Sequence, residues 1–144
     1  MAQIAYILLG HKRPDDVIGL ARGLAEAGDR VAIHYDGRAP AAEFAHIRAA
    51  LGGRGDIVLA PRRVKCGWGE WSLVQATLET ARAALAAFPE ATHVYMISGD
   101  CMAIKTAEYA RATLAGEDAD FIESHDFFES DWIRTGLKAE RLIY

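Results

Sequence analysis

Short apolar runs alternate with segments of helical periodicity along this chain, and that alternation limits its possible folds more than any other feature. Four runs have the length and composition of buried strands, and they lie at IAYILLG (4–10), RVAIHYDG (30–37), DIVLA (56–60) and THVYMISGD (92–100). Helical spacing is found at 14–28, 41–51, 70–88 and 106–116, and ADFIES (119–124) is predicted as a fifth strand. This order predicts an α/β fold, a mainly parallel sheet with helices on both faces.

Length and composition narrow the function classes. The 144 residues suffice for one domain but not two, so we expect residues 1–144 to form a single domain. Sixteen basic and twenty acidic residues give a net charge of -4, which argues against nucleic-acid binding. The start of the chain has neither a signal peptide pattern nor a membrane span, so a cytoplasmic location is predicted. Cys66 and Cys101 lack zinc or disulfide spacing and are predicted to be reduced thiols.

Polar loops follow the predicted strands, at the edge where parallel sheets bind ligands. They are GHKRP (10–14), HYDGRAP (34–40), PRRVKCGWG (61–69) and SGDCMAIKT (98–106). Helix capping or a solvated surface could explain any one of these loops. Four such loops at one edge indicate a ligand site.

Three common catalytic patterns are absent from these loops. No GxGxxG follows the first strand, no GxxxxGK[ST] occurs, and Ser98 does not lie in a GxSxG. Dehydrogenase, NTPase and serine hydrolase functions therefore have little support.

The side chains at the strand ends suit a nucleotide instead. Asp36 can bind a ribose or a uracil edge, and His11 and His34 are predicted at the same edge. Arg63, with Arg62 and Lys65 beside it, supplies positive charge for a diphosphate; a solvated loop is the alternative.

Trp68 lies between two glycines and offers a flat surface for a base or a sugar. The alternative is a buried tryptophan that anchors the core. Gly69 belongs to the same predicted turn.

Asp100 has three interpretations. It could cap the helix that follows near Ile104, ligate a divalent ion, or bind sugar hydroxyls. No second acid stands in a DxD spacing, so no metal is expected. Gly99 lets the backbone turn off the strand, and Lys105 is predicted to compensate the Asp100 charge.

Three segments carry a resemblance to a known family. GWGEWSLVQATLETARAAL (67–85) resembles a WG-x-x-SLV-x-A helix start, YMISGDCMAIKT (95–106) resembles LSG-x-D-x-PIKT, and AIHYDGRAP (32–40) resembles a strand that ends in His-x-Asp. These motifs are similar to those of the core-2/I-branching family of β-1,6-N-acetylglucosaminyltransferases and peptide xylosyltransferases. The matches run in family order from about Ile4 to Arg141. The family's acid falls one place later, at Cys101, and its proline falls at Ala103.

The resemblance implies a GT-A-like, Rossmann-type fold and an inverting glycosyltransferase. The donor would be a UDP-sugar of the GlcNAc or xylose type, the acceptor a carbohydrate or other hydroxyl, and neither metal nor other cofactor would be needed. The donor-binding residues implied by these matches are His34, Asp36, Trp68, Gly69, Ser98, Gly99, Ile104, Lys105 and Thr106.

The end of the chain resembles the family stretch that leads toward the acceptor. Glu129, Asp131 and Trp132 in that region are predicted on the acceptor side. The resemblance implies that the catalytic base lies beyond residue 144, so this chain would hold the donor half of the site. The apolar end, residues 142–144, also predicts a continuation of the chain or an oligomer partner. Two alternatives stay open, a non-catalytic nucleotide-sugar or carbohydrate binding module and a plain interaction domain.

Overall fold

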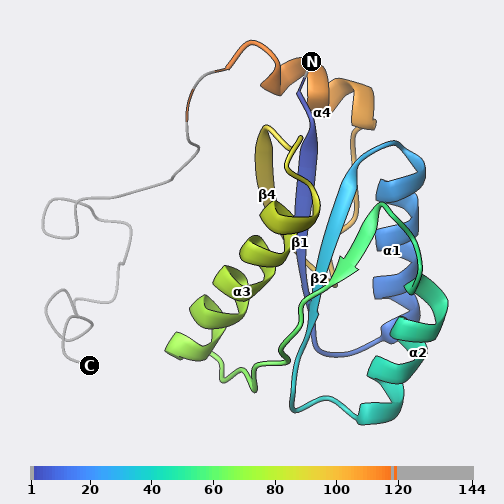
Figure 1. Ribbon diagram of the computed structural model, residues 1–144, viewed down its shortest axis with the longest axis vertical. Helices are drawn as coiled ribbons and strands as arrows, with labels where there is room; N and C mark the ends of the chain where they lie inside the picture. Colours follow the sequence, from blue (N-terminus) through green and yellow to red (C-terminus); the bar gives the residue numbers. More distant parts are fainter. Residues whose placement is uncertain (1, 118, 120–144) are drawn as a thin grey trace, which may run out of the picture.

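A computed structural model describes residues 2–117 and 119 and contains a parallel sheet with helices on both faces (Figure 1). The strands are β1 (Ile4–Gly10), β2 (Arg30–Tyr35), β3 (Ile57–Leu59) and β4 (His93–Ser98). The helices are α1 (Pro14–Glu26), α2 (Ala41–Leu51), α3 (Trp71–Ala87) and α4 (Ala107–Leu114). The predicted α/β class, element order and parallel sheet are confirmed.

The strand order is β3-β2-β1-β4, so β1 pairs with β2 on one side and with β4 on the other. From β1 the chain passes through α1 to β2 and through α2 to β3, and α3 then leads back to β4 on the other side of β1. Figure 1 shows α1 and α2 on one face of the sheet and α3 on the other. The carboxyl ends of β1 and β4 therefore form a topological switch point, where the loops diverge and leave room for a ligand.

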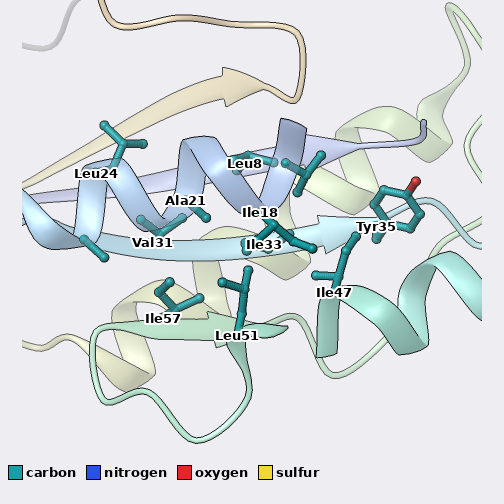
Figure 2. Packing of buried hydrophobic residues seen from close by; sticks show 12 residues of the cluster. Leu8, Ile18, Ala21, Leu24, Val31, Ile33, Tyr35, Ile47, Leu51 and Ile57 are labelled. Carbon is teal, nitrogen blue, oxygen red and sulfur yellow. The ribbon is translucent and has the colours of Figure 1, made fainter. Parts of the chain in front are cut away.

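The main core lies between the sheet and the α1–α2 layer (Figure 2). Leu8 of β1 and Ile33 of β2 are buried against Val17 of α1 and Ile47 of α2. Burial of this apolar surface is the main favourable term that fixes the two helices on this face.

On the opposite face, α3 packs closely because the facing residues are small. Ala5 and Ala32 of the sheet meet Ala84 of α3, and Phe88 closes the end of this cluster. The two apolar clusters cover opposite faces of β1 and β2. These strands position the loops of the candidate site.

The prediction that the strand at 92–100 is covered on both faces is wrong for the part of the chain described. There β4 is an edge strand, and Val94, Tyr95 and Met96 are 42%, 54% and 58% exposed. Apart from Ala119, the strand predicted at 119–124 lies outside the described residues. Among residues 2–117 and 119, no helix is long and apolar enough to cross a membrane.

Candidate functional site

The carboxyl ends of β2, β1 and β4 are joined in one row by backbone hydrogen bonds. The Asp36 amide donates to the Gly10 carbonyl at 2.8 Å, and the Gly99 amide donates to the Leu9 carbonyl at 2.9 Å. A Cβ added at Gly10 or at Gly99 would lie 3.0 Å from Cγ2 of Val17. Glycine at both positions thus allows α1 to approach the strand ends closely.

Three charged residues meet at the switch point, and we call Lys12, Arg13 and Asp100 the β1–β4 cluster. Lys12 Nζ lies 3.3 Å from Asp100 Oδ2, and Arg13 Nη2 donates to Asp100 Oδ1. Arg13 Nε is also 3.1 Å from Oδ2 of Asp16. All three side chains of the cluster are about half exposed, so a ligand can reach them.

The two cations of this cluster stabilise the ionised form of the Asp100 carboxyl. Hydrogen bonds from Arg13 and then Lys12 hold the pKa of the Asp100 carboxyl below its ordinary value. Arg13, the N-cap residue directly before α1, has a φ of 51°, in the left-handed region that residues other than Gly, Asn and Asp rarely adopt. Such conformations cost free energy and persist only where the surrounding structure holds them. They are found most often at ligand and active sites.

A groove of about 830 Å³ opens beside the cluster, between α1 and the segment that follows β4. Its charged lining includes Arg13, Asp15, Asp16, Asp100 and Lys105. The expected pairing of Lys105 with Asp100 is wrong. Lys12 and Arg13 compensate that charge, and the Lys105 ammonium lies 5.1 Å from the Tyr109 ring centre.

The capping interpretation of Asp100 is also wrong. α4 begins at Ala107, and its N-cap is Thr106, whose hydroxyl accepts a hydrogen bond from the Tyr109 amide at 3.2 Å. Asp100 stands six residues before the cap, so its carboxylate is available to a ligand rather than to the helix.

A second group of predicted residues lies at the end of β2, and we call His34, Asp36 and Arg63 the β2 cluster. His34 is 2% exposed, and its Nε2 accepts a hydrogen bond from the Val64 amide at 2.8 Å. Asp36 Oδ1 accepts bonds from the Arg38 amide at 2.7 Å and the Cys66 amide at 3.3 Å, and neither bond uses Oδ2. Both side chains therefore fix the loop before α3 against the strand end.

Arg63 supports the backbone of this region. Its guanidinium donates to the carbonyls of Tyr35, Asp36 and Ala39 at 3.1, 2.6 and 2.8 Å, and it lies over the Phe44 ring at 4.7 Å. These bonds engage Nε and Nη2 of Arg63 with the backbone, whereas the neighbouring Arg62 and Lys65 are exposed.

Trp68 is 99% exposed, so the interpretation as a core anchor is wrong. Gly69 after it has a φ of 72°, which favours glycine. His11 is exposed directly after β1. The groove beside the β1–β4 cluster is lined by none of these three residues, nor by His34, Asp36 or Arg63. Within the described part of the chain, this groove therefore contains residues of the β1–β4 cluster but not of the β2 cluster.

His34 should make folding stability depend on pH. Burial lowers the pKa of His34 below its ordinary value of 6.5, so the unfolded chain takes up this proton first. The contribution is complete above pH 6.5 and is lost as the pH falls through the folded-state pKa. Urea unfolding at pH 7.5 and 5.5 should show a larger loss for the native chain than for His34→Gln, whose amide oxygen can still accept the Val64 N–H. Equal losses in both chains would contradict this role.

The part of the chain described contains no cluster of metal ligands and no disulfide. Across residues 2–117 and 119, no three His, Cys, Asp or Glu side chains are grouped to hold a metal ion. Cys66 is half-buried and Cys101 is exposed, and both are free thiols.

The polar loops at the switch point are thus held on a Rossmann-type sheet that runs through most of the chain. Comparison with protein-family models matches residues 4–140 to the Core-2/I-Branching enzyme model. The chain belongs to this family. Its fold is accordingly the GT-A-like fold of a glycosyltransferase. A search of curated proteins finds no match.

Sequence reasoning missed Lys12 and Arg13 as members of the site. Their loop, GHKRP, is polar and lies directly after the first strand, and this position is the sequence signal that indicates them. Glu129, Asp131 and Trp132, predicted on the acceptor side, lie outside the described residues.

Proposed function

We propose that this member of a glycosyltransferase family binds a UDP-sugar at the carboxyl edge of its sheet. The sugar, GlcNAc or xylose, would pass with inversion to a hydroxyl of a carbohydrate or other acceptor. One observation carries the proposal: two cations and a carboxylate meet at the switch point beside a groove of about 830 Å³. That volume falls within the range of about 300–1,000 Å³ common for ligand pockets.

The diphosphate of the donor would lie on Lys12 and Arg13. These cations already hold an anion, the carboxylate of Asp100, so their geometry suits a negatively charged oxygen. A diphosphate carries more charge than the carboxylate, and it can displace the carboxylate from them. Asp100 is then left to accept hydrogen bonds from sugar hydroxyls.

The uridine and the sugar of the donor would lie on opposite sides of the diphosphate. Asp36 stands at the end of β2, where the first βαβ unit of a dinucleotide-binding fold places the acid that binds a ribose, and exposed Trp68 could stack on the base. The sugar would enter the groove, where Asp100 and Lys105 line the wall.

The transfer step follows from this placement. The acceptor oxygen attacks the anomeric carbon and loses its proton to a base, while the bond from that carbon to the diphosphate oxygen breaks and UDP leaves. Lys12 and Arg13 would stabilise the charge that develops on the leaving diphosphate. We expect the base beyond residue 144, no metal requirement and a cytoplasmic location, as the sequence predicted.

Thermal unfolding with nucleotides tests the proposal. UDP should raise the melting temperature more than GDP, because a ligand bound only by the folded state stabilises it, by about 2.7 kcal/mol at a concentration of 100 times Kd. The shift should persist in EDTA, since side-chain cations hold the diphosphate.

Two outcomes would overturn parts of this proposal. Equal or absent shifts for UDP and GDP would remove the uridine-specific donor site. A UDP shift that EDTA abolishes and manganese restores would remove the metal-independent mechanism.

A further inference from the structure

Against the other residues that the structure describes, the segment that carries Asp100 and Lys105 is loosely packed. All residues from Cys101 to Thr106 are exposed, and α4 after them has no buried residue. Two adjoining hollows, of about 830 and 390 Å³, separate this segment from α1 and the sheet. Apolar residues such as Tyr6, Leu24 and Tyr109 line the smaller hollow without filling it.

Among the described residues, Arg111 makes the side-chain hydrogen bonds that join α4 to the other end of the sheet. Arg111 Nη1 donates to the Ala27 carbonyl at 3.1 Å and lies 2.7 Å from Oδ1 of Asp29. The Asp29 side chain is 1% exposed and that of Arg111 is 19% exposed. Both partners belong to the amino edge of the sheet, opposite the candidate donor site.

The chemistry of this pair favours a positioning role. A buried ion pair contributes little stability beyond what apolar packing would give, but it fixes geometry. Asp29 Oδ2 is buried and has no hydrogen-bond partner among the described residues, so the pair is not arranged for maximal stability. Since no residue of α4 is fully buried, this ion pair is the most buried polar contact that fixes where α4 lies among the described residues.

We propose that Arg111 and Asp29 are positioning residues for the donor site. They hold α4, and α4 holds the 99–106 loop so that Asp100 stays beside Lys12 and Arg13. The inference rests on the proposed UDP-sugar site, and it adds a connection from the amino edge of the sheet to the affinity of that site. A donor that binds both sides of the groove would in turn steady α4.

The test uses the full chain and the double variant Asp29→Asn/Arg111→Met. Removing Arg111 alone would leave a buried carboxylate unpaired, so the double variant keeps the fold while removing the attachment. Amide hydrogen exchange should become faster in residues 99–114 and stay unchanged in β1 and β2. The UDP-sugar, UDP-GlcNAc or UDP-xylose, should bind about tenfold more weakly by calorimetry, a coupling of ordinary size between two sites, whereas UDP alone, which lacks the sugar that Asp100 would contact, should keep its affinity.

Two further variants separate positioning from general stability. Arg54→Met breaks an ion pair of the same edge, in which Arg54 Nη2 lies 2.7 Å from Asp56 Oδ2, and it should leave the 99–114 exchange and the UDP-sugar affinity unchanged. Arg111→Lys keeps a cation for Asp29 and should restore most of the affinity.

The exchange and binding measurements can fail separately. Unchanged exchange in residues 99–114, or native UDP-sugar affinity in the double variant, would overturn the positioning role. If the native chain bound no UDP, the proposed donor function would fall, and the exchange measurement alone would still confirm or overturn the attachment.

Discussion

An Arg63→Met variant is expected to lose about 2–4 kcal/mol of the free energy of unfolding, because three carbonyls lose a charged hydrogen-bond donor. The Tyr35 carbonyl lies at the end of β2, and the carbonyls of Asp36 and Ala39 belong to the turn that leads from β2 to α2. Methionine can pack on Phe44 but cannot donate to them. Urea unfolding monitored by circular dichroism measures this loss directly.

The adjacent arginine provides the matched control. Arg62 is exposed, so Arg62→Met should change the free energy of unfolding by less than about 0.5 kcal/mol. Similar stabilities for the two variants would show that the carbonyl contacts of Arg63 do not hold the turn, and would return Arg63 to the candidates for the diphosphate.

Local patterns predicted most of the fold because each element has its own signal. The helix predicted at 41–51 has those bounds in the structure, and the strand predicted at 4–10 does as well. The strand at 92–100 was predicted correctly in type but not in burial. A continuous apolar run indicates a strand covered on both faces, and the sequence could not show that β4 is an edge strand of the described sheet.

The site was predicted by its loops and not by its contacts. Arg62 and Arg63 are equivalent in a sequence, and only the fold shows that one guanidinium meets three carbonyls while the other is exposed. Asp100 pairs with Arg13, 87 residues earlier, through the parallel pairing of β1 with β4. No local spacing encodes a partner that far away.

The helix cap is a case in which a local signal existed. Thr106 stands directly before α4 and has one of the side chains that commonly cap helices, with a carboxylate at Glu108 in the first turn. Asp100 belongs to the loop before it. Weighing the two candidates by their distance from the first helical residue would have favoured Thr106.

The largest effect on ligand binding is expected from the cations of the β1–β4 cluster. In the double variant Lys12→Met/Arg13→Gly, UDP should bind about a hundredfold more weakly, since each charge-assisted hydrogen bond contributes roughly tenfold or more to affinity. Glycine suits the left-handed backbone at position 13, so the fold should persist. Asp100→Asn is the matched control, because it removes only the carboxylate that now occupies the two cations.

Calorimetric titration of UDP into the native chain and these two variants tests most directly whether the donor diphosphate lies at the switch point between β1 and β4. We predict native affinity or better for Asp100→Asn, and about hundredfold weaker binding for Lys12→Met/Arg13→Gly at an unchanged melting temperature. Unchanged UDP affinity in the Lys12→Met/Arg13→Gly chain would contradict the account, because the diphosphate would then lie elsewhere on the molecule.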